Sequence, residues 1–270
     1  GHWVGVAVAE KGDADRWLSA ASAGGPSSNP VGGTSLGRLC RAVSRILDAV
    51  GEPRLTGPVA AMFRELAPRI SRGPVADLLQ GDPGRVDACA TELATLLARD
   101  PETYPLVCTT AAPTMMEGGA SVPNVMPQDM GAAVNFRLLP GETLEGLVSA
   151  VRELVADLGV EVALMGGSNP PSAVSRWDGW GMERLRQAAA PLFTEPDGTP
   201  VPLVPTLAVG ASDARMYEGV CDQCLRFSAF VVDAGESSRG VHGTDERVLE
   251  RSFTQGVAFL RRLVEACCVH

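Results

Sequence analysis

Two spacings of apolar residues alternate along the chain, and together they predict a mixed α/β protein. Segments of strand length alternate with segments whose apolar residues recur every three or four positions. Pro and Gly stand at the ends of most segments, where they interrupt regular structure. The predicted strands are residues 3–9, 14–21, 106–116, 130–139, 160–165, 203–209 and 225–232. The predicted helices are residues 36–50, 144–158, 180–192 and 244–267, with several short helices between 57 and 100.

The order of the elements predicted between residues 14 and 165 is typical of one small fold. A strand, a helix, a helical insertion at about 57–101, two strands, a second helix and a final strand follow one another. This is the split βαβ, or ferredoxin-like, order, in which two helices cover one face of a four-stranded antiparallel sheet. Residues 14–171 are therefore predicted to form an inserted domain. The flanks, 1–13 and 172–270, are expected to pack together as part of an α/β domain, although they are short for a complete one.

The charge and the cysteine content argue against several classes of partner. The net charge is −9 and the pI is about 4.9, which disfavours nucleic acid and anionic membranes. We find no run of about 20 apolar residues that could span a bilayer, and no signal peptide at the start of the chain. The seven cysteines are odd in number and scattered, which favours reduced thiols and a cytoplasmic location over a disulfide framework.

Five motifs occur in an order that resembles one enzyme family. They are Val6–Gly12 (VAVAEKG), Gly25–Pro30 (GPSSNP), Asn124–Pro127 with Asn135–Gly141 (NVMP and NFRLLPG), Gly210–Arg215 (GASDAR) and Val241–Arg247 (VHGTDER). Each motif alone is weak. Their order and spacing over essentially the whole chain resemble the dinuclear zinc aminoacylase/carboxypeptidase family, peptidase family M20. The helical insertion is similar to that of its carboxypeptidase S and N-acyl-amino-acid hydrolase branch.

The resemblance implies a fold, an activity and a cofactor. Members of the family combine an α/β catalytic domain with an inserted ferredoxin-like lid domain, through which they form homodimers. Two zinc ions activate a bridging water and polarise the amide carbonyl, and a glutamate acts as general base. The substrate is a small peptide or an N-acyl amino acid, cleaved at an amide next to a free carboxylate. The chain is then expected to be the C-terminal two-thirds of such a metallopeptidase or amidohydrolase.

The resemblance also implies substrate-binding roles for six residues. Arg137 is expected to bind the substrate carboxylate with its two-pronged guanidinium, although a surface arginine on a strand is the ordinary alternative. Asn124 is expected to reach the substrate of the partner subunit, or simply to form a turn. The loop after residue 209 has two possible roles. It is either an ordinary strand-to-helix turn capped by Asp213, or it contacts the substrate near the metals. The loop residues in question are Gly210, Ser212, Asp213 and Arg215.

The chain departs from the family pattern in ways that bear on catalysis. His242 is the one residue that corresponds to a zinc ligand of the family, and a single imidazole cannot hold zinc, which takes three or four protein ligands. Pro26 stands where the family has a lid histidine that helps to polarise the carbonyl. No general base or other catalytic residue is identified. The alternative function is a non-catalytic remnant that dimerises or binds carboxylated ligands through the lid domain.

Two further features carry weaker expectations. Cys221 and Cys224 have the spacing of a redox or zinc-binding pair, but without a second pair we interpret them as ordinary thiols. If part of the catalytic domain is missing, the apolar surface of the flanks that it would cover is exposed to solvent. We therefore expect the isolated chain to aggregate.

Overall fold

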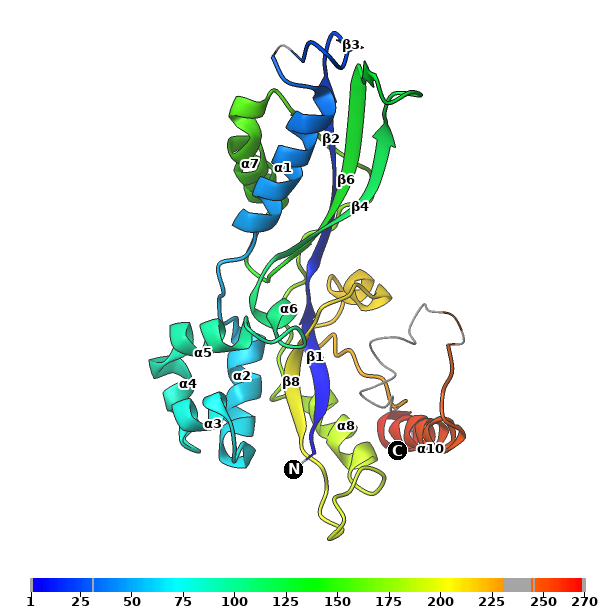
Figure 1. Ribbon diagram of the computed structural model, residues 1–270. Helices are drawn as coiled ribbons and strands as arrows, with labels where there is room; N and C mark the ends of the chain where they lie inside the picture. Colours follow the sequence, from blue (N-terminus) through cyan, green and yellow to red (C-terminus); the bar gives the residue numbers. More distant parts are fainter. Residues whose placement is uncertain (1, 31, 231–243, 245, 269–270) are drawn as a thin grey trace.

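The chain forms an elongated molecule with two lobes that one long strand path connects (Figure 1). This computed structural model describes residues 2–30, 32–230, 244 and 246–268. Strand β1 (Val4–Glu10) lies in the lower lobe and continues after Lys11 into β2 (Gly12–Ala21) of the upper lobe. The linker that returns from the upper lobe, residues 165–179, passes close to the point where β1 continues into β2, which we call the joint. A Cβ on Gly12 would lie 2.8 Å from the backbone nitrogen of Pro171, so only glycine fits there.

The upper lobe is built on a four-stranded sheet. The strand order is β4-β6-β2-β7, and each neighbouring pair is antiparallel. Helices α1 and α7 cover one face of this sheet, and their buried residues share a core with β2 and β6 (Figure 1). At the far end, two short strands, β3 and β5, pair with each other. The elements are β3 (Gly25–Pro26), α1 (Ser35–Ala49), β4 (Thr110–Gly118), β5 (Val125–Met126), β6 (Asp129–Leu138), α7 (Leu144–Val155), the 3₁₀ helix η2 (Ala156–Leu158) and β7 (Glu161–Leu164).

Threonines cap the N-termini of the two long helices of this lobe. The hydroxyl of Thr34 accepts a hydrogen bond from the backbone nitrogen of Gly37 at 2.9 Å. The hydroxyl of Thr143 accepts one from that of Gly146 at 3.0 Å. Each cap satisfies a backbone donor that the first helical turn leaves free. Buried and half-buried residues alternate along β2, as expected of a strand with one face toward the core.

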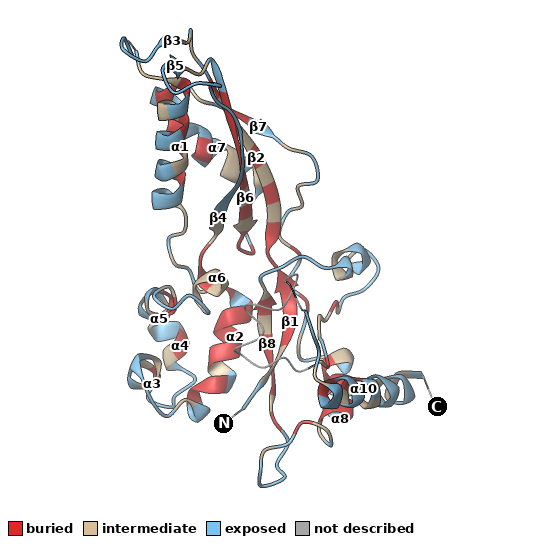
Figure 2. Ribbon diagram, turned by 45° about the vertical axis from the view of Figure 1, so that its right-hand side comes forward, coloured by how far each residue is buried: buried red, intermediate tan, exposed pale blue. Residues whose placement is uncertain are grey.

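The lower lobe is built around two parallel strands, β1 and β8. Two separate cores lie against this pair, one formed by the helical insertion and the other by α8 and α10. Figure 2 shows that β1, β8 and much of α2 are buried. The elements are α2 (Gly57–Leu66), the 3₁₀ helix η1 (Ala67–Arg69), α3 (Pro74–Leu79), α4 (Arg85–Ala88), α5 (Ala90–Leu97), α6 (Tyr104–Val107), α8 (Trp180–Ala189), β8 (Leu203–Ala208), the 3₁₀ helix η3 (Asp213–Tyr217) and α10 (Glu250–Cys268).

The helical insertion, predicted at about 57–101, packs against the lower lobe. Val59 and Met62 of α2 are buried in one cluster with Val204 and Leu207 of β8. The insertion therefore shares its core with the β1–β8 pair, whereas the four-stranded sheet packs with α1 and α7. Its position along the sequence, between a helix and a strand of the upper lobe, does not reveal this packing.

Three predicted elements differ from the structure. The strand predicted at 106–116 begins only at Thr110, because Tyr104–Val107 forms α6 with Pro105 in its first turn. In the segment predicted as strand 225–232, Arg226 forms one isolated bridge with Ala7, and residues 231–232 lie outside the described part. The last helix was predicted from Thr244 but begins at Glu250. Val248 lies in the part of the predicted helix that does not form. Its side chain is exposed, so no packing stabilises an additional helical turn there.

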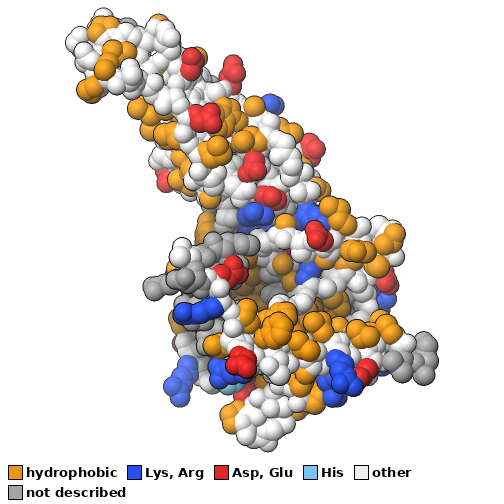
Figure 3. All heavy atoms as spheres, turned by 90° about the vertical axis from the view of Figure 1, so that its right-hand side faces the viewer, with side chains coloured by type: hydrophobic (Ala, Val, Ile, Leu, Met, Phe, Trp, Pro, Cys, Tyr) orange, Lys and Arg blue, Asp and Glu red, His pale blue; other side chains and the backbone are white. Residues whose placement is uncertain are grey.

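Helix α10 presents an apolar stripe to solvent. Phe253, Val257, Leu260 and Val264 follow helical spacing, and each is about half exposed. The opposite side of the helix is anchored by Phe259, whose ring contacts those of Phe193 and Phe227. Figure 3 shows hydrophobic side chains gathered on this face of the lower lobe. In the described part of the chain, no helix has both the length and the apolarity needed to cross a bilayer.

Candidate functional site

A buried carboxylate, Glu10, lies at the joint between the two lobes. Its side chain is fully buried at the end of β1. The oxygen Oε1 accepts hydrogen bonds from Nε and Nη2 of Arg226 at 3.1 and 3.0 Å. The oxygen Oε2 accepts one from the backbone nitrogen of Ser212 at 2.5 Å. A buried charge needs such partners, because desolvation otherwise outweighs any benefit of burial.

Arg226 extends this cluster toward the linker that returns from the upper lobe. Its Nη2 also donates to Oε1 of Glu218 at 2.7 Å, and its Nη1 donates to the carbonyl of Cys224 at 2.8 Å. The second oxygen of Glu218 accepts a hydrogen bond from the backbone nitrogen of Ala173 at 3.1 Å. One nearly buried guanidinium thus connects two carboxylates and the linker.

Lys11 follows Glu10 and turns toward the opposite side of the joint. Its ammonium donates to the carbonyls of Pro105 and Cys108 at 3.0 and 2.7 Å. Burial lowers the pKa of Lys11 from 10.5 to about 8, and the nearby carboxylate of Glu142 opposes this effect. Both charged residues of the joint are therefore held by buried hydrogen bonds.

Of the loop residues predicted to contact substrate, Ser212 and Arg215 face this cluster. The hydroxyl of Ser212 lies 3.3 Å from Oε1 of Glu10, and Nη2 of Arg215 lies 3.8 Å from Oε2. Ser212, rather than Asp213, caps the short helix that follows, because its hydroxyl accepts from the backbone nitrogen of Ala214. Asp213 and Gly210 are exposed, and the side chain of Asp213 has no hydrogen bond or ion pair among the described residues.

Arg215 has an unsatisfied donor. Its Nη1 and Nη2 donate to the carbonyls of Pro170 and Lys11, each at 3.4 Å. Its Nε is buried and has no hydrogen-bond partner within the described residues. Buried donors are almost always paired, so this nitrogen is free to donate to a further acceptor, such as a water molecule or a ligand.

Arg137 lies on the sheet face opposite the helices, beside the same joint. The register of β2 and β6 places it across from Asp13, and its Nη1 lies 3.5 Å from Oδ1 of that residue. Asn135, on the same face, donates from Nδ2 to both Asp13 and Asp15 at 2.8 Å. One third of the Arg137 side chain is exposed, so part of its fork of donors faces solvent.

Asn124 lies far from these residues. It precedes β5 at the end of the sheet where β6 begins, whereas Arg137 lies near the end of β6 beside the joint (Figure 1). The carbonyl of Asn124 accepts a hydrogen bond from the backbone nitrogen of Ser27 at 2.9 Å, and Pro26 pairs with Val125. The structure thus brings Asn124 and the loop of Pro26 together at the tip, and keeps both away from Arg137.

The described residues do not supply a metal site. No group of three or more His, Cys, Asp or Glu side chains is arranged to hold a metal ion within the described part of the chain. His242 lies outside the described residues. Cys221 and Cys224 are free thiols, and burial raises the pKa of Cys224. Since zinc takes three or four protein ligands, the described donors do not fit a zinc centre.

Glu10, Lys11, Glu218 and Arg226 belong to the joint but are not among the site residues that the sequence predicts. Glu10 and Lys11 lie within the motif Val6–Gly12 and directly follow the predicted strand 3–9. One signal was available, because two adjacent charges directly after a fully apolar strand remain buried unless each finds a partner. Arg226, the partner of Glu10, comes from the other end of the chain, and the carbonyls that bind Lys11 lie 94 and 97 positions away, so no local pattern points to them.

The comparisons with known proteins agree with this architecture. Residues 32–266 match the family model of Peptidase family M20/M25/M40. The N-fatty-acyl-amino acid synthase/hydrolase PM20D1.1 of Danio rerio is 29% identical over 266 residues, which are 96% of this chain and 48% of that protein. The probable carboxypeptidase S-like 2 of Dictyostelium discoideum is 27% identical over 263 residues, which are 96% of this chain and 48% of that protein. The chain therefore spans about half the length of these relatives.

Solved structures show the same fold. The M20 family metallo-carboxypeptidase Sso-CP2 from Sulfolobus solfataricus superposes with a TM-score of 0.64 at 15% identity, covering 98% of this chain and 62% of that one. The di-peptidase Dug1p from Saccharomyces cerevisiae gives the same TM-score at 14% identity, covering 98% of this chain and 56% of that one. Because the family model covers most of the sequence, the chain belongs to Peptidase family M20/M25/M40.

Proposed function

We propose that this chain is part of an amidohydrolase or metallopeptidase that cleaves an amide next to a free carboxylate. The observation that carries the proposal is the position of two arginines at the joint. Arg137 and Arg215 contact the same strand segment, at Asp13 and at Lys11. Each keeps donors that no described residue satisfies, and a planar guanidinium matches the geometry of a carboxylate.

The relatives support the choice of substrate class. Their names describe N-fatty-acyl-amino acid hydrolysis, carboxypeptidase activity and dipeptidase activity, and all of these substrates carry a free carboxylate. We propose a small peptide or an N-acyl amino acid as the substrate. A non-catalytic remnant gains no support from these relatives.

Zinc is the cofactor that we propose for the complete enzyme. His242 is expected to be one ligand, and the remaining ligands are expected from polypeptide that this chain does not contain. For the chain itself we propose a cytoplasmic location, because its seven cysteines are all free.

We further propose that the upper lobe is a ferredoxin-like lid that forms homodimers. The proposed domains are 1–13 with 172–270, and 14–171, with the helical insertion at about 57–101 lying against the former. Strand β4 supports the dimer, because it lies at the edge of the sheet and exposes Met115 and Met116. An uncovered edge of this length offers unpaired backbone groups to a second strand.

Ligand binding by the chain tests the proposed substrate class. N-acetyl-leucine and its carboxamide are titrated by calorimetry against the wild type, Arg137→Gln and Arg72→Gln. Arg72 is exposed, has no hydrogen bond or ion pair among the described residues, and serves as the matched control for charge. We expect the acid to bind more tightly than the amide by about tenfold, and this preference to vanish in Arg137→Gln alone. Equal binding of acid and amide by the wild type contradicts the proposal.

Sedimentation tests the dimer. Met116→Lys places a charge on the β4 edge and is expected to weaken association by about tenfold or more. Met216→Lys is the control, since Met216 is exposed and lies outside any strand. A monomeric wild type, or equal effects of both variants, would argue against edge pairing through β4.

A further inference from the structure

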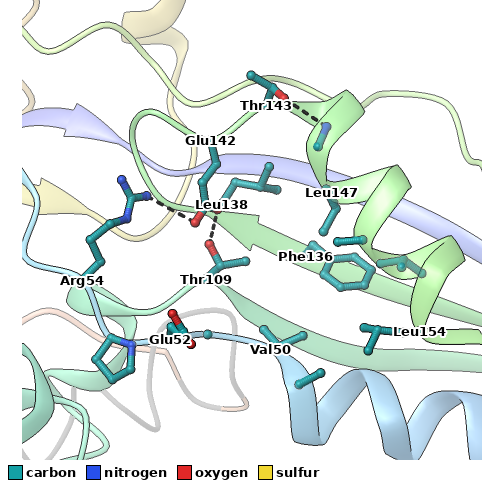
Figure 4. Close-up of a pocket in the computed structure, with 16 residues that line it drawn as sticks. Val50, Glu52, Arg54, Thr109, Phe136, Leu138, Glu142, Thr143, Leu147 and Leu154 are labelled. Carbon is teal, nitrogen blue, oxygen red and sulfur yellow. Dashed lines mark hydrogen bonds and ion pairs between the residues drawn. The ribbon is translucent and has the colours of Figure 1, made fainter.

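A cavity of about 560 Å³ lies in the upper lobe, apart from the residues of the joint. It is enclosed by the end of α1, the following loop, the start of β4, the end of β6 and the inner side of α7 (Figure 4). This volume is within the range of roughly 300–1,000 Å³ that small-molecule pockets occupy. Nothing in the proposed hydrolysis uses this cavity.

The inner wall of the cavity is apolar. Phe136, Leu138 and Val151 are buried and form its floor. Val50, Leu147 and Leu154 are only partly buried, so they present apolar surface toward the open space. Figure 4 shows Phe136, Leu147 and Leu154 grouped at one end of the cavity. Such a wall favours an apolar chain over water.

Polar groups gather at the other end. The side chain of Glu142 accepts hydrogen bonds from Thr109, from the backbone nitrogen of Leu139 at 3.2 Å and from Nη2 of Arg54 at 3.2 Å. Both of its oxygens are therefore occupied. Nη2 of Arg54 also donates to the carbonyl of Pro140, whereas its Nε and Nη1 have no partner in the described part of the chain. Arg54 thus places a half-exposed cation, which shares its charge with Glu142, at the polar end (Figure 4).

The sheet separates this cavity from the proposed substrate site. Along β6, Phe136 and Leu138 face the helices and line the cavity, while Arg137 between them points to the opposite face. A ligand in the cavity would therefore leave Arg137 free. The two sites can be tested independently.

We propose that this cavity binds a molecule with an aliphatic chain and a terminal carboxylate, of the fatty-acid type. The aliphatic chain of the ligand lies against Phe136, Leu147 and Leu154, and its carboxylate pairs with the guanidinium of Arg54. This is a second site, beyond the proposed hydrolysis, on the helix-covered face of the sheet. Glu52 also borders the cavity and is exposed, so its charge opposes the carboxylate through solvent.

Titration of the 270-residue chain with dodecanoate and with dodecanol tests both ends of the ligand. The wild type is expected to bind both, and dodecanoate more tightly. Arg54→Gln is expected to weaken dodecanoate about tenfold and to leave dodecanol within about twofold. Glu52→Gln is expected to tighten dodecanoate a few-fold, because it removes the opposing charge. Arg137→Gln is expected to leave dodecanoate binding unchanged, which separates this site from the proposed substrate site.

A blocking variant tests the location. Ala150 lines the cavity from α7 and is exposed, so Ala150→Trp fills the space without disturbing the core. Ser149→Trp places the same ring on the same helix, at an exposed residue that does not line the cavity. We expect only Ala150→Trp to weaken both ligands, by about tenfold or more, while circular dichroism shows both variants folded. The proposal is overturned if the wild type binds neither ligand, if both tryptophan variants behave alike, or if Arg54→Gln leaves dodecanoate binding unchanged.

Discussion

Both Nε and Nη2 of Arg226 donate to a single oxygen of Glu10, at 3.1 and 3.0 Å, although the two residues are 216 positions apart. Glu10 ends the central strand of the lower lobe, and Arg226 reaches it from the other end of the sequence. Since Glu218 and the linker share the same guanidinium, this pair fixes the joint at which the two lobes meet.

Removal of Arg226 is expected to destabilise the chain strongly. Arg226→Met leaves the carboxylate of Glu10 buried beside an apolar side chain, and the loss of one partner of a buried pair costs about 3–5 kcal/mol. The free energy of unfolding in urea measures this change. In Glu10→Gln/Arg226→Met the loss is expected to be smaller than the sum of the two single losses, because the two residues interact directly.

The control is an ion pair of the same type on the surface. Arg176→Met removes a partner of Asp178, and both side chains are largely exposed. Exposed pairs contribute little, so we expect a change within about 1 kcal/mol. Equal losses in Arg226→Met and Arg176→Met would show that burial of Glu10 has no energetic consequence.

Local spacing in the sequence predicts most of the upper lobe, because its elements are amphipathic and well capped. Thr34 and Thr143 cap α1 and α7, and apolar segments of strand length predict β2 and β6. The helical insertion illustrates the limit of such reasoning. The spacing of its apolar residues identifies helices but does not show which core these helices enter. Their partners Val204 and Leu207 lie about 100 positions or more further along the chain.

The candidate site is predicted less completely, because its parts come from distant segments. Ser212 and Arg215 do lie together at the joint, as their shared loop suggests. Asn124 and Arg137 belong to neighbouring motifs, yet they lie at opposite ends of β6. An extended strand carries residues apart by about 3.3 Å per position, so neighbouring motifs on a strand need not share a site.

The protonation of Lys11 is expected to make stability depend on pH. In the folded chain burial lowers the pKa of Lys11 to about 8, whereas the unfolded chain has the ordinary value of 10.5. Between these values the unfolded state binds more protons, so the free energy of unfolding contributed by Lys11 rises with pH. The gain is complete above 10.5, is lost as the pH falls to about 8, and amounts to about 3 kcal/mol.

Comparison with Lys11→Met isolates this contribution. Burial raises the pKa values of Cys108 and Tyr104 nearby. These two groups therefore lower the free energy of unfolding as the pH rises, whereas Lys11 raises it. Both thiol and phenol are present in the wild type and in the variant, so the difference between the two unfolding free energies reports Lys11 together with its electrostatic effect on Cys108. A difference that stays constant from pH 7.5 to 10 would contradict the lowered pKa.

Gly131 is expected to tolerate no side chain. A Cβ built on this residue of β6 would lie 2.1 Å from a ring carbon of Trp17. Gly131→Ala is therefore expected to lower the unfolding free energy by about 1–3 kcal/mol, as overpacking does elsewhere. Gly57→Ala, where the added atom meets nothing within 4 Å, is expected to be neutral or slightly stabilising. If Trp17 causes the loss, Trp17→Leu reduces the additional cost of Gly131→Ala.

The apolar stripe of α10 is expected to drive self-association of the isolated chain. Phe253 and Leu260 are 57% and 48% exposed, and they follow one side of the helix. Phe253→Glu/Leu260→Glu removes apolar surface at little cost to the core, so light scattering at increasing concentration is expected to show smaller particles. Thr254→Glu/Arg262→Gln controls for charge on the same helix, because it makes the chain more negative by the same two units and both residues are exposed and polar. If the control reduces association as much as the stripe variant, charge rather than the apolar surface governs association; if the wild type is already monodisperse, the stripe is covered or inert in this chain.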